Sequence, residues 1–341
     1  MGKIFPQLIS LKENPSLLGS TLALIEKSFK YQPPFSFQQD FAPLIDASNH
    51  HNCFVLVNEE GVVIAHVGVR ERKLFLNKRE FTIAMLGGIA VDEANRGKGY
   101  FNQLMSHVMV EKKDEVAFFL LWSDQEKLYQ KFGFHLCGFQ YEFEQNNNDS
   151  KFEKHKYHLL SANEKKDIQL LYQTSFAQEF TTVERNQTDW DLLKQITSAD
   201  LYIKKTGSII SDYFFMGKGQ DLTGIIYEYG SKTSLESVIK AATGFGKVWA
   251  SKAYIETENA QYQYLLCPGD SNQLSEFLSE YTNQQINLRT INQMKGEAYF
   301  DFNDETLALD TAEFLRGVFG PGSFEELGEL KPIFISGLDS I

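Results

Sequence analysis

The sequence has 341 residues, of which 43% are hydrophobic and 23% are charged, as in ordinary globular proteins. This length exceeds what a single hydrophobic core usually serves, so we expect two domains. The net charge of −12 disfavours a nucleic-acid surface, because phosphate binding needs a basic patch.

The sequence lacks the patterns that direct a protein into or across a membrane. Residues 1–6 show no long apolar run of a signal peptide, and no stretch of about 18 apolar residues could span a bilayer. The three cysteines, Cys53, Cys137 and Cys267, are isolated and lack metal-ligand spacing, which indicates a reducing compartment. We therefore expect a cytoplasmic protein with no metal site, no membrane partner and no nucleic-acid partner, and its oligomeric state stays open.

The first elements of the chain read as helices followed by antiparallel strands. Residues 17–29 have amphipathic spacing after an Asn-Pro-Ser start signal, and 41–47 is a short helix. Three strands follow, at 53–57, 62–70 and 81–91, with polar turns between them.

A polar, glycine-bearing loop joins the third strand to a helix that begins at Tyr100. The free N–H groups of a first helical turn and the helix dipole favour an anion at such a junction. Gly97 and Gly99 allow close backbone approach, while Arg96 and Lys98 add positive charge. The loop matches neither the Walker motif nor the dinucleotide fingerprint, so the sequence predicts a different kind of phosphate site.

Residues 96–101 resemble the pyrophosphate loop, R/Q-x-x-G-x-G/A, of the GNAT superfamily of N-acetyltransferases. Phe101 stands where that family usually has Gly or Ala. A buried strand at 118–122 follows, and residues 128–134 then resemble the family's Y-x-K-x-G-F signature. In that signature the tyrosine, here Tyr129, is the usual general acid.

The second half of the chain echoes the first, after a turn-rich segment at 146–150 that we expect to link two domains. Features about 147 residues apart correspond: Phe29 with Phe176, a strand start at Cys53 with one near Leu201, and a strand start at Val62 with one at Ile209. This offset indicates a tandem duplication.

The second copy lacks the phosphate loop. The expected strand at 222–229 leads into a helix from about Leu235 without an Arg-x-x-Gly sequence, and Gly217-Lys-Gly219 reads as a turn between strands. A helix at about 305–318 and a last strand at 332–336 complete the expected elements.

The GNAT resemblance implies acetyl transfer from acetyl-CoA to an amine by direct attack. The residues it assigns to acetyl-CoA are Ile89, Ala90, Val91, Arg96, Gly97, Lys98, Gly99, Tyr100 and Phe101. A backbone N–H near Ala90 would bind the thioester oxygen as it becomes anionic. Tyr129 would protonate the leaving thiolate, since a phenol of pKa about 10 keeps its proton at neutral pH.

The proton acceptor stays open, because the strand at 85–91 has no acidic residue where many GNAT enzymes place a glutamate. Asp124 is one candidate, although it could equally cap the helix of Tyr129. His66 is another, although such a histidine is more often structural. The C-terminal carboxylate of Ile341 is a third, since acetyltransferases of the enhanced-intracellular-survival type use their C-terminus in this way, and water is a fourth.

The sequence thus predicts an α/β (α+β) protein of two tandem GNAT-like domains, each a mixed, mostly antiparallel sheet flanked by helices. Residues 1–147 would form the catalytic domain and 152–341 a degenerate second one. The expected activity is that of an acyltransferase, an acetyl-CoA-dependent N-acetyltransferase acting on a small-molecule or peptide amine, which the acidic charge would favour if cationic. A non-catalytic acyl-CoA-binding sensor or scaffold, and a transferase for longer acyl chains, are the alternatives.

Overall fold

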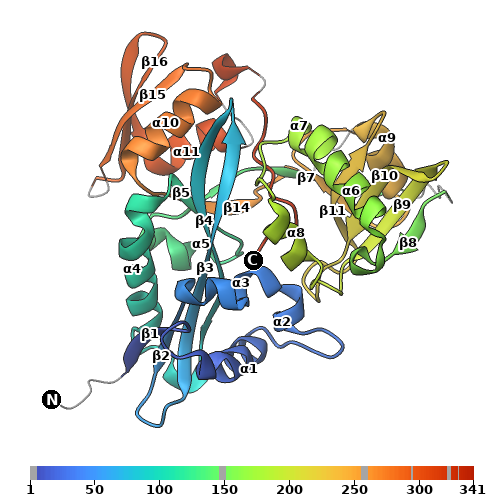
Figure 1. Ribbon diagram of the computed structural model, residues 1–341. Helices are drawn as coiled ribbons and strands as arrows, with labels where there is room; N and C mark the ends of the chain where they lie inside the picture. The colour runs from blue at the N-terminus through green and yellow to red at the C-terminus, as the bar shows by residue number, and fades with distance from the viewer. Residues whose placement is uncertain (1–5, 146–150, 255–259, 293–294, 321–323, 329) are drawn as a thin grey trace. The chain divides into compact units, whose positions relative to one another are not determined.

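The computed structural model describes residues 6–145, 151–254, 260–292, 295–320, 324–328 and 330–341. The chain forms two compact units (Figure 1): unit 1 comprises 1–135, 265–310 and 341, and unit 2 comprises 136–264 and 311–340. This division differs from the expected 1–147 and 152–341, because residues 265–310 return to the first unit. The expected linker at 146–150 lies outside the described residues. No helix in the described ranges is long and apolar enough to cross a membrane.

The main sheet of unit 1 has seven strands in the order β1-β2-β3-β4-β5-β14-β6. Its strands are β1 Gln7–Ser10, β2 Cys53–Val57, β3 Val63–Leu76, β4 Arg79–Val91, β5 Phe118–Leu121, β14 Tyr264–Pro268 and β6 His135–Cys137. The β4–β5 pair is parallel, and its neighbours β3–β4 and β5–β14 are antiparallel. The predicted strands at 53–57, 62–70, 81–91 and 118–122 are therefore confirmed, and β1 was missed.

Helices cover both faces of this sheet. The helices are α1 Leu18–Ser28, α2 Phe37–Asp40, α3 Ala42–Ile45, α4 Tyr100–Lys112 and α5 Glu126–Tyr129, with 3-10 turns at Pro15–Leu17, Ala47–Asn52, Glu93–Asn95, Lys113–Glu115 and Gln130–Phe132. Phe54 contacts His107 of α4, whereas its neighbour Val55 packs with Ile25 of α1. Because consecutive strand residues point to opposite faces, α4 and α1 lie on opposite sides of the sheet.

A smaller three-stranded sheet completes unit 1. It consists of β15 Ile286–Asn292, β16 Glu297–Phe302 and β17 Glu305–Asp310, beside α10 Ser271–Tyr281. The predicted helix from Glu305 is wrong over its first turn and a half, where the chain is β17. Asn303 and Asp304 both have positive φ, which forms a tight hairpin turn that directs the chain back along β16.

Unit 2 contains a second seven-stranded sheet, in the order β13-β7-β12-β11-β10-β9-β8. Its strands are β13 Ala260–Gln261, β7 Gln140–Phe143, β12 Lys247–Ala250, β11 Ile225–Ser231, β10 Ile209–Met216, β9 Asp200–Thr206 and β8 Glu153–His155. Its helices are α6 Ala162–Leu171, α7 Ala177–Glu179, α8 Gln187–Leu193, α9 Leu235–Ala242 and α11 Thr311–Phe319, with a π-helical turn at Tyr172–Phe176 and 3-10 turns at Tyr157–Leu159 and Glu325–Leu327.

The two main sheets exchange strands along the chain. The alternating sequence at 139–143 predicts a strand that closes the first sheet, but this segment is β7, which pairs with β12 in the second sheet. In return β14, which comes from the second half of the chain, pairs with β5 in the first (Figure 1). This exchange explains why no single cut between 147 and 152 separates the two units.

Unit 2 repeats the arrangement of unit 1 without its loop. The predicted strands near Leu201, Ile209 and 222–229 are confirmed as β9, β10 and β11, and a helix begins at Leu235 as predicted. Gly217-Lys-Gly219 lies between two antiparallel strands, as expected of a turn. Only three residues separate β11 from α9, so the second unit has no glycine loop at this junction.

The last residues of unit 2 are anchored by a buried ion cluster instead of a strand. The predicted strand at 332–336 is wrong, since this segment forms only an isolated bridge from Ile333 to Thr181. Arg185 is fully buried, and it binds Asp339 at 2.9 and 2.6 Å and Glu228 at 3.0 and 2.5 Å. Burial alone would lower the pKa of Arg185, but the charges of Asp339 and Glu228 raise it well above its usual value.

Asp339→Asn should therefore destabilise unit 2, although the residue lies two positions from the end of the sequence. Arg185 would still pair with Glu228, but its two hydrogen bonds to residue 339 would no longer end on a charged acceptor, which costs about 1.5–3 kcal/mol. Urea unfolding followed by tryptophan fluorescence measures this loss. The matched control is Asp191→Asn, which removes the same charge from an exposed pair with Lys194 and should leave the unfolding midpoint nearly unchanged. Equal unfolding midpoints for the two variants would contradict the anchoring role.

Candidate functional site

The site begins where β4 separates from β5. Their parallel pairing covers only three residue pairs and ends at Met85 and Leu120, although β4 continues to Val91. Within the described residues, the β4 edge beyond Met85 therefore has no ladder partner on the β5 side. β4 and β5 are thus paired at one end and unpaired at the other.

A β-bulge bends β4 in the stretch that has no partner on the β5 side. The β3–β4 register passes from His66 opposite Ala90 to Gly68 opposite Gly87, so two residues of β4 face one of β3. Gly88, one of the two residues in the bulge, has φ +59°, a left-handed conformation that suits glycine.

The predicted anion loop follows directly. Asp92 accepts a hydrogen bond from Ala94 N–H and pairs with Lys27 at 3.1 Å, which holds the start of the loop. Gly97 and Gly99 have φ +76° and +82°, and a Cβ added to either would contact nothing within 4 Å. The loop backbone is thus open to solvent, as a phosphate-binding loop requires.

The loop's two cations are exposed beside these glycines. Arg96 Nε lies 3.4 Å from the Val91 carbonyl, and Lys98 Nζ donates to Asn95 Oδ1 at 2.9 Å. Helix α4 then begins at Tyr100, with Gly99 as its N-cap residue. The segment from Arg96 to Tyr100 therefore brings two positive charges and the first N–H groups of a helix together.

Phe101 connects this loop to Tyr129. Its ring meets the Tyr129 ring edge-on at 5.7 Å and the Phe132 ring at 5.6 Å, and Lys131 Nζ lies 5.2 Å from its centroid. The bulky residue at the family's Gly/Ala position thus packs against the predicted general acid. Sequence reasoning gave Phe101 to the cofactor and missed this contact, which the aromatic run Tyr129, Phe132 and Phe134 could have suggested.

Tyr129 is buried, and its environment keeps its proton. Burial raises the pKa of Tyr129 to about 12, while a hydrogen bond with Ser123 opposes the rise and the charge of Asp124 adds to it. Asp124 itself is exposed and does not cap α5, whose N-cap is Gln125. The phenol is consequently a proton donor over the whole physiological range.

Two further residues lie against the β4 bulge in unit 1. His66 is fully buried, and its Nδ1 lies 2.7 Å from the Gly88 carbonyl. Burial lowers the pKa of His66 to about 4, although the Gly88 contact opposes this. Ile341 packs against a hydrophobic cluster that includes Ala90 of β4. A Cβ added to Gly87 would lie 2.6 Å from the backbone carbonyl carbon of Ile341.

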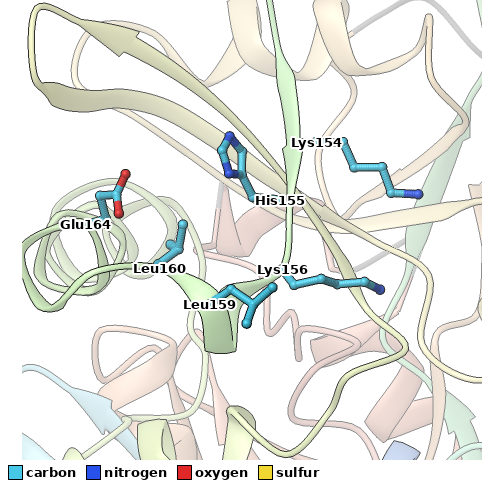
Figure 2. Close-up of a pocket in the computed structure, with 6 residues that line it drawn as sticks. All are labelled: Lys154, His155, Lys156, Leu159, Leu160 and Glu164. Atoms are coloured by element: carbon cyan, nitrogen blue, oxygen red, sulfur yellow. The ribbon is translucent and has the colours of Figure 1, made fainter.

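Unit 2 has a surface hollow whose lining differs from that of the glycine loop in unit 1. It measures about 350 Å³ and lies beside β8 and α6, between Glu164 and the lysines of β8 and its continuation (Figure 2). Lys154 and Lys156 both pair with Asp200, and Glu164 pairs with Lys205. Since these charges are already matched, the hollow does not resemble a phosphate site.

The comparisons with known proteins agree with this geometry. Residues 14–137 match the family model of the acetyltransferase (GNAT) domain, a span that contains β4, the loop, α4 and Tyr129. This part of the chain is therefore similar to a GNAT acetyltransferase domain. No curated protein matches the sequence.

The solved structures extend the GNAT likeness to the whole chain. Eis1 from Mycobacterium abscessus is 10% identical with a TM-score of 0.61, covering 98% of this chain and 100% of its own. A GCN5-related N-acetyltransferase from Kribbella flavida is 12% identical with a TM-score of 0.60, covering 98% of each chain. A probable N-acyltransferase from Enterococcus faecalis is 14% identical with a TM-score of 0.57, covering 89% of this chain and 84% of its own. The chain therefore shares the fold of these structures over most of its length.

His66 in the GNAT domain should stay neutral, with its proton on Nδ1, from pH 8 down to about pH 5. Its pKa in the folded state is lowered to about 4 from the usual 6.5. The corresponding stability is present above pH 6.5 and is lost as the pH falls toward 4. Imidazole nitrogen shifts in ¹⁵N NMR, assigned with His66→Phe, measure the protonation state. A midpoint above pH 6 would contradict the burial argument.

Proposed function

We propose that this protein is an acetyl-CoA-dependent N-acetyltransferase whose active site lies in unit 1. The observation that carries the proposal is the unpaired edge of β4 beyond Met85, which leads directly into the Arg96–Gly99 loop. An unpaired strand edge needs a partner for its backbone groups, and the amide-rich pantetheine arm of CoA supplies one. Unit 2 has no equivalent loop, so we expect one cofactor per chain.

Acetyl-CoA would lie along β4 with its phosphates at α4. The backbone of Ile89, Ala90 and Val91 would pair with the pantetheine amides, and the N–H groups from Gly97 to Phe101 would bind the pyrophosphate. Arg96 and Lys98 would add charge-assisted contacts to the phosphate oxygens. The open space around Gly97 and Gly99 supports this assignment, because phosphates must approach the backbone closely.

The reaction would be direct attack of a neutral amine on the thioester carbon. The carbon–nitrogen bond forms and the carbon–sulfur bond breaks, so the amine loses one proton and the CoA sulfur gains one. A backbone N–H of the β4 segment near Ala90 would stabilise the oxyanion between these steps. Tyr129 would donate to the leaving sulfur, and its raised pKa means that the phenol still carries its proton when the thiolate forms.

Asp124 is the proton acceptor that we propose for the amine, directly or through water. It is exposed, as a group that exchanges protons with solvent should be, and its charge acts on Tyr129. His66 is less suited to this role, because it is fully buried and its Nδ1 is already bound to the Gly88 carbonyl. Ile341 remains an alternative because its backbone lies against Gly87.

The acceptor would be a small-molecule or peptide amine. The net charge of −12 favours a cationic acceptor over an anionic one. The three buried thiols support a reducing, cytoplasmic setting, and burial raises the pKa of Cys53 and of Cys267 to about 12. Screening an amine library for CoA release, with acetyl-CoA and longer acyl-CoAs in parallel, identifies both substrates.

Arg96→Ala combined with Lys98→Ala should weaken acetyl-CoA binding roughly tenfold or more. Charge-assisted hydrogen bonds contribute about 1.5–3 kcal/mol each, and both cations lie beside the open loop. Titration calorimetry measures the change in Kd. A double variant at the exposed Lys12 and Lys166, each to Ala, removes the same charge and should bind normally. Unchanged affinity in the Arg96/Lys98 variant would remove the loop assignment.

Tyr129→Phe should keep cofactor affinity and lower the single-turnover rate by about 10²–10⁴-fold, the usual contribution of a general acid. The substitution removes the phenol and retains the ring that packs on Phe101. Rapid-mixing measurements isolate the chemical step from product release. Tyr299→Phe removes a phenol in the small sheet of the same unit and should react at the wild-type rate. A wild-type rate for Tyr129→Phe would refute the role, and tight binding without turnover in the wild type would favour an acyl-CoA sensor.

A further inference from the structure

One buried polar side chain, that of His66, forms a hydrogen bond with the bulge of β4. His66 of β3 lies opposite Ala90, is completely shielded from solvent, and places its Nδ1 2.7 Å from the carbonyl oxygen of Gly88. A carbonyl oxygen only accepts hydrogen bonds, so Nδ1 carries the proton and donates it. The other nitrogen, Nε2, has no partner within the described residues.

Packing fixes the imidazole in this orientation. A Cβ added to Gly88 would lie 3.1 Å from His66 Cε1 and 3.2 Å from Phe37 Cζ, so the ring is in close contact with both the bulge and α2. Phe37 in turn stacks on Phe41 at 4.8 Å. The Gly88 carbonyl therefore cannot turn away without displacing a buried ring or leaving a buried donor unpaired, and both are costly.

The orientation of this carbonyl determines where the next N–H groups point. Asp92 N–H donates to Ile64 of β3 at 2.9 Å. Hydrogen-bonding groups alternate between the two edges of a strand, so the N–H of Val91 points to the opposite edge, where β5 has ended. A change in the bulge would shift this alternation and turn different groups toward the open edge.

We propose that His66 is a positioning residue, which holds the Gly88 carbonyl and thereby directs the backbone N–H of Val91 toward the bound acyl group. The inference rests on the proposed acyl transfer and assigns His66 no proton transfer of its own. The backbone N–H stabilises the oxyanion, and His66 sets its direction.

Two substitutions at His66 separate positioning from proton transfer. His66→Phe retains a planar ring and removes the donor. His66→Asn retains an N–H donor near the Nδ1 position and removes Nε2. We expect His66→Phe to lower kcat about 10- to 100-fold, as small misplacements of reacting groups do, with acetyl-CoA Kd changed less than about threefold. His66→Asn should recover most of the lost kcat.

The outcomes are distinct. Equal loss of kcat in both variants would assign the function to Nε2 and overturn the proposal, as would wild-type kcat in His66→Phe. If the same equal loss comes with a large drop in the unfolding temperature, His66 is purely structural. That result would also overturn the proposal. A wild-type protein that turns over no amine refutes the proposed function, and this inference with it, before any variant is made.

A glycine pair tests the bulge without changing His66. Gly88→Ala adds a methyl group against His66 and Phe37, whereas Gly61→Ala adds one at the similar φ of +77° with nothing within 4 Å. Both variants carry the same kind of backbone strain, but only Gly88 lies in the bulge. We expect kcat to fall at least tenfold in Gly88→Ala and to stay normal in Gly61→Ala. Normal kcat in Gly88→Ala would overturn the proposal.

Discussion

The early end of the parallel ladder between β4 and β5 is the constraint on which the candidate site depends. β5 has only four residues, and its pairing with β4 stops at Leu120. β4 continues and carries backbone groups that no neighbouring strand satisfies within the described residues. Unpaired backbone groups are costly when buried, so they favour either solvent or a ligand that supplies the missing partners. The glycine loop at the end of β4 places positive charge and free N–H groups at one end of that edge.

Unit 2 shows how the same strand arrangement can be closed. β11 also outlasts its parallel pairing with β12, which covers only Ile225 and Ile226. There the C-terminal segment packs against the strand: Ser336 hydrogen bonds Glu228, and a Cβ on Gly337 would lie 2.5 Å from the Tyr227 ring. Arg185 forms ion pairs with both Glu228 and Asp339 inside the core of this unit. The corresponding strand is thus covered by the chain's own last residues in unit 2, whereas β4 in unit 1 is the strand to which we assign the cofactor.

Local patterns predicted the parts of the site that are contiguous in sequence. The strand, loop and helix at 79–112 were readable because hydrophobic spacing, glycine and charge change together over a few residues. The strand exchange was not, because β7 and β14 pair with partners more than a hundred residues away and carry no signal of which sheet they join. The buried role of Asp339 was hidden for the same reason, since an aspartate near the end of a sequence usually lies in solvent. Its partners, Arg185 and Glu228, come from distant segments.

Desolvation determines whether Tyr129 can transfer its proton. A phenol with a pKa of about 12 would not readily protonate an ordinary thiolate, whose conjugate acid has a pKa of about 8.5. Burial, however, raises the pKa of thiols as well as phenols, because it disfavours the charged form of both. Cys267 of the same unit shows the size of this effect, since burial raises its pKa to about 12. A CoA thiolate formed in an equally dry gap would therefore match Tyr129 in basicity. Matched pKa values make proton transfer nearly thermoneutral, so excluding water from the gap beside β4 would enable the same tyrosine to act as the acid.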